Sequence, residues 1–120
     1  MHSNFDVDFY RKSDDSCPIE DFLDSLDTKM QAKLLRLIML LEQNGNELRE
    51  PYSKALSDGI FELRTKQGSN ITRILYFFVV GRKIILTNGF TKKSMKTPQS
   101  EIDLAKRYRT EYLHRLEESV

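Results

Sequence analysis

Two kinds of hydrophobic periodicity occupy the first part of the chain. Apolar side chains take every second position over residues 5–10, which is typical of a half-buried strand. After a polar turn, Pro18 suits the first turn of a helix, and apolar residues then recur every three or four positions. The T-x-x-Q sequence that begins at Thr28 is a capping box, and Asn44 with Gly45 supplies a left-handed stop. The pattern predicts a strand over 5–10 and a helical hairpin over 18–44.

The second half of the chain changes to strand periodicity. Residues 46–59 show little periodicity, and we expect a loop there that ends near Leu56. Three strands are expected next, over residues 60–66, 71–80 and 83–90. The middle one is apolar on both faces apart from its beginning, which is typical of a central strand. Thr97 and Pro98 then introduce a last helix with an amphipathic stripe.

The order of these elements is β-α-α-β-β-β-α. It predicts an α+β fold with a mainly antiparallel sheet whose helices pack on one face, which leaves the other face free for function. The chain contains no internal repeat, low-complexity segment or linker. We therefore expect a single domain over residues 1–120.

The net charge of +1 conceals a separation of charge along the chain. Residues 1–51 carry six Lys and Arg against eleven Asp and Glu, whereas residues 52–96 carry nine against two. Residues 97–120 carry four against five. A basic middle segment of this kind indicates a polyanionic partner.

Several kinds of catalytic apparatus have no basis in this sequence. His2 and His114 have no companions at metal-ligand spacing, so neither a metal nor another cofactor is expected. Cys17 is the single cysteine, which is typical of a small buried hydrophobe in a reducing compartment. No stretch of about 18 apolar residues and no signal peptide is present, so we expect no membrane contact and a cytoplasmic location.

The remaining candidate chemistry lies on the expected strands. Counting back from a turn centred on Gly68 places Arg64 and Arg73 nearly opposite each other, on one face of adjacent strands. Lys92 and Lys93 lie at the end of the next strand, where they can close the group. Arg73 interrupts an otherwise apolar strand. Because burying an unpaired guanidinium is costly, Arg73 has either a buried acidic partner or an open site for an anion.

The same residues also admit a plainer interpretation. Glu62 shares the expected face of Arg64, and the two could form an ordinary solvated ion pair of little energetic consequence. Lys and Arg are normally exposed, so solubility alone would account for Arg64, Lys92 or Lys93 taken singly.

Three segments together resemble a known family. They are LSDGIFELR at 56–64, TRILY at 72–76 and GFTKK at 89–93, with Thr97 and Pro98 ahead of the last helix. In combination, and with the order of the elements, they resemble the HigB-like, phage-derived branch of the RelE toxin superfamily. The likeness covers nearly the whole chain.

This resemblance implies a RelE-like fold and the toxin of a type II toxin–antitoxin system. Such toxins are ribosome-dependent endoribonucleases, also called mRNA interferases. The ribose 2′-hydroxyl attacks the neighbouring phosphate without a metal and leaves a 2′,3′-cyclic phosphate and a new 5′-hydroxyl. The implied partners are a helix-turn-helix, HigA-like antitoxin, the 70S ribosome with its mRNA, and operator DNA through the antitoxin alone.

The resemblance also implies roles for single residues. Arg73 matches the strand arginine that the superfamily sets against the scissile phosphate, and Arg64 matches a neighbouring phosphate-facing position. Lys92 and Lys93 match the place of a basic residue after the last strand. One of them is a candidate general acid or base, because a lysine can release a proton and an arginine cannot. The residues expected to bind flanking RNA are Lys54, Lys66 and Lys96.

The sequence departs from many relatives at the proton donor. They carry a C-terminal tyrosine or histidine for this purpose, whereas Tyr108 and Tyr112 fall on the packed stripe of the last helix. The identity of the acid and base therefore stays open. So does the sister ParE-like branch, which shares the fold but poisons gyrase, or a nucleic-acid-binding module on the same fold.

Overall fold

The computed structural model describes residues 5–119, so His2 lies outside the described residues. Its centre is a five-stranded sheet with the strand order β1-β5-β4-β3-β2. The strands are β1 (Asp6–Phe9), β2 (Ser53–Ala55), β3 (Phe61–Gln67), β4 (Asn70–Val79) and β5 (Lys83–Lys92). β1 runs parallel to β5 and the other neighbouring pairs are antiparallel. The α+β class is confirmed, and the sheet is mixed.

Two helices form the expected hairpin and cover one face of the sheet. They are α1 (Pro18–Asp24) and α2 (Thr28–Asn44), and a short 3-10 turn, η1 (Gly45–Glu47), follows. The N-cap of α2 is Asp27 rather than the expected Thr28, since the Asp27 carboxylate accepts a hydrogen bond from the Met30 amide at 2.8 Å. Gly45 ends α2 with a φ of 54°. The ring of Phe5 fills the place that a side chain at Gly45 would need.

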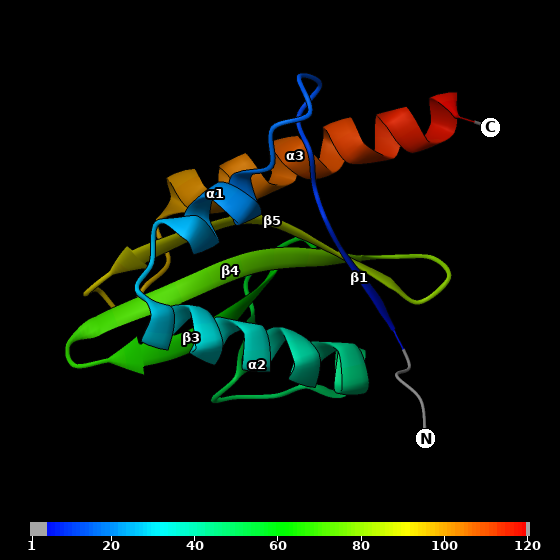
Figure 1. Ribbon diagram of the computed structural model, residues 1–120. Helices are drawn as coiled ribbons and strands as arrows, with labels where there is room; N and C mark the ends of the chain where they lie inside the picture. The colour runs from blue at the N-terminus through cyan, green and yellow to red at the C-terminus, as the bar shows by residue number, and fades with distance from the viewer. Residues whose placement is uncertain (1–4, 120) are drawn as a thin grey trace.

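The last helix, α3 (Gln99–Glu118), packs on the opposite face. The expectation that all helices lie on one face is therefore wrong. Leu75, Phe77 and Ile85 bury their side chains on this second face, against Ile102 and Ala105 of α3. Figure 1 shows the strands running between α2 and α3. Two central strands that are apolar on both faces need cover on both, and the stripe of α3 supplies the second layer.

One strand was not expected. β2 lies within the segment 46–59 that the sequence predicts to be a loop, and it pairs with the first half of β3. Its three residues are too few to show alternation, and pairing with β3 rather than apolar burial defines it. Ser53 is its buried member, and its hydroxyl lies 2.5 Å from that of Tyr76. The order observed is thus β-α-α-β-β-β-β-α.

None of the helices within residues 5–119 has the length and apolar character needed to cross a membrane.

Candidate nucleic-acid interface

The register of the strands brings most of the expected basic residues to one face. Arg64 pairs directly with Arg73 across β3 and β4, as the count from Gly68 predicts. Directly opposed residues of a sheet share a face. Three further pairings therefore add lysines to the face that carries the two arginines. Lys54 pairs with Glu62, Lys66 pairs with Ile71, and Ile71 in turn pairs with Lys92. We call this set the basic face, made up of Lys54, Arg64, Lys66, Arg73 and Lys92.

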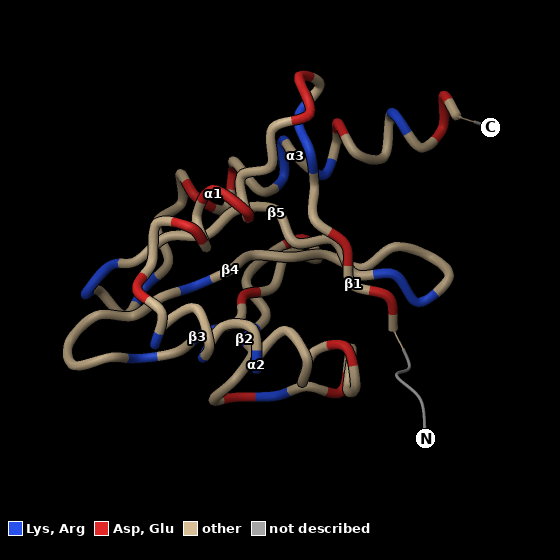
Figure 2. The backbone as a smooth tube through the Cα atoms, in the orientation of Figure 1, with Lys and Arg blue, Asp and Glu red and all other residues tan. Residues whose placement is uncertain are grey.

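The basic face is the same face that α3 covers at its other end. Arg73 neighbours Phe90, which belongs to the cluster packed against α3, and the guanidinium carbon lies 5.4 Å from the centre of the Phe90 ring. Figure 2 shows the Lys and Arg positions of β3, β4 and the end of β5 at the side of the sheet nearest the β3–β4 turn. The apolar half of the face thus binds the helix, and the basic half lies beyond it.

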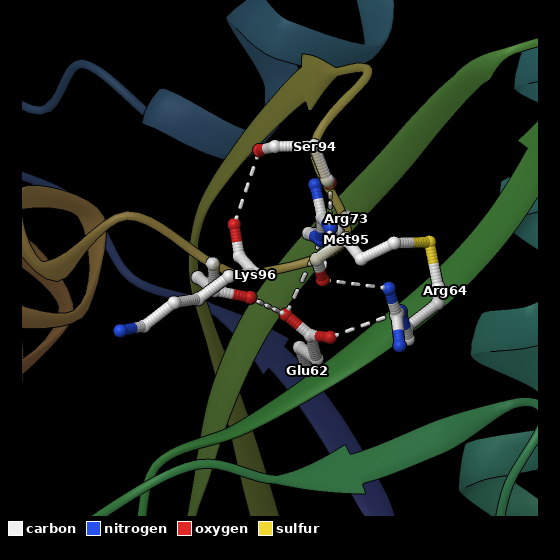
Figure 3. A network of polar contacts seen from close by, with 7 residues as sticks. Glu62, Arg64, Arg73, Ser94, Met95 and Lys96 are labelled. Carbon is white, nitrogen blue, oxygen red and sulfur yellow. Dashed lines mark hydrogen bonds and ion pairs between the residues drawn. The ribbon is translucent and has the colours of Figure 1, made fainter.

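A buried carboxylate joins the two arginines. Glu62 Oε2 lies 3.1 Å from Arg64 Nε, and Glu62 Oε1 lies 3.6 Å from Arg73 Nε. Figure 3 shows the Glu62 carboxylate facing both side chains. The side chains of Glu62 and Arg73 are 1% and 0% exposed, whereas the side chain of Arg64 is 15% exposed. This is a buried ion-pair group rather than the solvated surface pair that the sequence also allowed.

The segment between β5 and α3 closes over this group. We call residues 94–97 the strap. Arg73 Nη2 donates to the carbonyl oxygens of Ser94 and Met95 at 2.5 Å and 2.8 Å, and Arg64 Nη2 donates to the Met95 carbonyl at 3.1 Å. The Thr97 hydroxyl donates to Glu62 and fixes the other end of the strap. The strap thereby seals Arg73 from solvent.

The environment of Arg73 is unusual for a cation. Burial lowers its pKa, Glu62 raises it and the nearby Arg64 lowers it again. Arginine nevertheless stays protonated in proteins. Within residues 5–119, its Nε and Nη1 have no hydrogen-bond partner, although Nε is within ion-pair distance of Glu62. The sequence allowed either a buried acidic partner or an open anion site for Arg73, and the structure has the buried acidic partner, Glu62. The Nε and Nη1 groups of Arg73 remain as donors that another acceptor could use.

The exposed lysines lie at different positions relative to the sealed group. Lys92 is the last residue of β5, Lys93 follows it, and both are exposed. Lys96 belongs to the strap, but its ammonium points away from the arginines in Figure 3. It lines a hollow of about 450 Å³ together with Lys54. The site therefore consists of a buried arginine–glutamate centre with exposed lysines on the neighbouring strands and on the strap.

The remaining candidates have structural surroundings. Tyr108 stacks on Tyr10 with ring centres 4.4 Å apart, and Tyr112 meets Phe77 edge to face at 5.9 Å. Both tyrosines thus lie on the packed stripe, as expected. His114 is exposed, with Nδ1 3.8 Å from Glu118, and Cys17 is buried in the core under α1 and α2.

The sequence does not predict the role of two residues of the site. It allows a solvated surface ion pair for Glu62, and for Thr97 it indicates only the start of a helix. The signal for Glu62 was present, because it stands two positions before Arg64 and therefore on the same face as both arginines. Thr97 gave no such signal, because its contact with Glu62 spans 35 positions and depends on the path of the strap.

Fold and site define a small α+β protein with a basic face built around a buried arginine–glutamate group. The model of one family, described as phage-derived protein Gp49-like (DUF891), matches residues 21–110. The chain belongs to this family. Membership of the family is compatible with a role as the toxin of a toxin–antitoxin system. None of the curated proteins matches the sequence.

Proposed function

We propose that this protein is the toxin of a type II toxin–antitoxin pair and that it cleaves mRNA on the ribosome. Membership of the Gp49-like family supports the toxin class. One observation carries the ribonuclease assignment: Arg64 and Arg73 stand directly opposite each other at the basic end of the sheet. The two guanidiniums share the one carboxylate of Glu62, so the group keeps a net positive charge, and the exposed lysines of the basic face add to it. Such a site suits the negative charge of a phosphate in reaction.

The proposed reaction needs charge stabilisation, a base and an acid. The ribose 2′-oxygen attacks the neighbouring phosphorus while its proton passes to the base. The bond from phosphorus to the 5′-oxygen then breaks, and the acid protonates that oxygen. Arg64 and Arg73 would stabilise the negative charge of the phosphorane, and Lys92 or Lys93 would serve in proton transfer. Lys54, Lys66 and Lys96 would bind flanking phosphates.

Contact between Arg73 and a phosphate requires the strap to move. The carbonyl oxygens of Ser94 and Met95 occupy two of the acceptor positions around the guanidinium. A phosphate offers oxygen acceptors of the same kind with a negative charge added. We therefore propose that RNA binding displaces the strap and substitutes phosphate oxygens for the two carbonyls.

Mapping of mRNA ends in cells tests the proposal. Induction of the wild-type chain should stop growth and create new ends within coding regions. Arg73→Ala and Arg64→Ala should abolish both effects while the circular dichroism spectrum stays unchanged. Arg107→Ala, at an exposed position of α3, is the matched control and should remain toxic. Growth arrest without new mRNA ends would contradict the ribonuclease assignment.

A second function draws support from the burial of Arg73. A guanidinium that is fully buried against Glu62 already has a structural reason to be there. A non-enzymatic toxin of the ParE type, or a module that binds nucleic acid, would need only the exposed cations. Inhibition of DNA supercoiling by purified gyrase in the presence of the protein, with mRNA intact, would favour the gyrase poison.

The proposal includes a set of partners and a location. The partners are a helix-turn-helix antitoxin of the HigA type, the 70S ribosome with mRNA, and operator DNA reached through the antitoxin. The proposed location is the cytoplasm. Co-expression of the neighbouring reading frame should restore growth, and failure of the two chains to form a complex would count against the antitoxin.

A further inference from the structure

A second surface feature lies at the edge of the sheet, next to the buried arginine–glutamate group, with which it shares Arg64. It is a cleft of about 490 Å³ between α2, the chain before β2 and the second half of β3. This volume falls within the range of about 300 to 1,000 Å³ that binding pockets have. We call it the β3-edge cleft. Its apolar lining residues are Leu37, Leu40, Pro51, Tyr52, Ile71 and Met95.

The rim of the β3-edge cleft is basic. Four cations line it, namely Lys33, Arg36, Arg64 and Lys66, against the single carboxylate of Glu50. Arg64 is paired with Glu62. No acidic side chain of the described chain lies within ion-pair distance of Lys33, Arg36 or Lys66. The rim therefore carries positive charge that the protein itself does not neutralise.

The backbone adds a third feature. The pairing of β2 with β3 ends at Leu63. The next residue of β3, Arg64, still donates its amide to the Tyr52 carbonyl. Amides two residues apart in a strand point the same way, so the Lys66 amide also faces this open edge. Lys33 Nζ donates to the Lys66 carbonyl at 3.2 Å. An open edge of this kind pairs with an extended chain.

We infer that the β3-edge cleft is a docking site for an acidic, extended segment of a partner protein that inserts an apolar side chain. The aliphatic lining fits the apolar side chain, the rim fits flanking Asp and Glu residues, and the Lys66 amide fits a peptide carbonyl. This inference goes beyond the proposed ribonuclease activity and does not depend on it.

RNA is the competing occupant, and the lining disfavours it. The rim cations would suit phosphates equally well. The side chains of Leu37, Leu40 and Ile71 offer no hydrogen bonds to the edges of a base, however, and unpaired base edges would be costly to bury. Tyr52 is the single aromatic residue among the lining residues, which gives little surface for stacking successive bases.

An occupant of this cleft would also contact the strap. Met95 lines the cleft with its side chain exposed, and its carbonyl accepts hydrogen bonds from both arginines. The cleft and the arginine–glutamate group therefore share one residue of the strap as well as Arg64.

Selection from a library of short random peptides on the immobilised full-length protein tests the inference. The selected peptides should share an apolar residue flanked by Asp and Glu. Arg36→Glu should weaken the best peptide about tenfold, since it reverses a rim charge, and high salt should weaken it further. Arg107→Glu, at an exposed position of α3, should leave the affinity unchanged.

A second pair of variants tests the apolar contact. Tyr52 is 47% exposed, so Tyr52→Ser should leave the fold intact and weaken the peptide. Leu35→Ser is the control, because Leu35 is 51% exposed on α2 and does not line the cleft.

Three outcomes would overturn the inference. They are the selection of no peptides, the selection of peptides without acidic residues, and peptide affinities that the cleft variants do not change. Binding of oligouridine that Arg36→Glu and Tyr52→Ser weaken, with no acidic peptide selected, would make the cleft an RNA site instead. Peptide binding is measured apart from mRNA cleavage, so either proposal can fail without the other.

Discussion

Replacement of Glu62 by glutamine removes the one negative charge that lies between the two arginines of the site. Glu62→Gln keeps the shape of the side chain but leaves Arg73, which is 0% exposed, without a counter-ion. Breaking a buried ion pair from one side costs roughly 3 to 5 kcal/mol of unfolding free energy. Arg73 retains two carbonyl acceptors and the ring of Phe90, and Arg64 reaches solvent. We therefore expect the lower end, about 3 kcal/mol.

Urea denaturation followed by circular dichroism measures this loss. The matched control is Glu20→Gln, which removes an exposed ion pair with Arg11 whose oxygen and nitrogen lie 2.9 Å apart. Exposed pairs contribute about 0 to 1 kcal/mol, so the control should be nearly neutral. A Glu62→Gln protein as stable as the Glu20→Gln protein would refute the argument that Arg73 depends on Glu62 in the folded state.

Three further predictions concern the scaffold. Asp27→Ala should lower the unfolding free energy by about 1 kcal/mol, because the Met30 amide loses its cap acceptor, and Ser at position 27 should restore most of it in the same urea assay. Gly45→Ala should destabilise the protein by more than about 1 kcal/mol, because φ is 54° and the Phe5 ring blocks the new side chain, whereas Gly68→Ala meets open space and should cost less. Burial, together with Glu111, raises the pKa of Tyr10 from 10.0 to about 12. The unfolded chain then loses this proton first, so stability should fall as the pH rises from 10 to about 12, and Tyr10→Phe should show a shallower fall in ultraviolet-monitored unfolding.

The sequence predicted the elements whose periodicity is long and clear. The helical hairpin, the three long strands and the register of Arg64 with Arg73 all follow from local spacing, because one short hairpin determines the pairing. The sequence does not predict β2, because three residues are too few to show the alternation of a strand. The apolar stripe of α3 does not show on which face of the sheet the helix packs. The apolar side chains on both faces of β4 and β5, however, require helices on both faces.

The chemistry of the site was only partly predictable. Spacing along strands placed the arginines and Glu62 on one face, and the apolar surroundings of Arg73 correctly raised the possibility of a buried acidic partner. The strap could not be foreseen, because backbone carbonyls of residues 94 and 95 bind Arg73 irrespective of which side chains those residues carry. The β3-edge cleft likewise depends on where β2 begins, which no side-chain pattern records.

Cleavage of a defined mRNA in a reconstituted translation system is the most direct test of the proposed ribonuclease activity. We predict cuts within the coding region that require the 70S ribosome, fragments ending in a 2′,3′-cyclic phosphate, and no cuts with a folded Arg73→Ala protein. An intact mRNA in the presence of translating ribosomes and folded wild-type protein would contradict it.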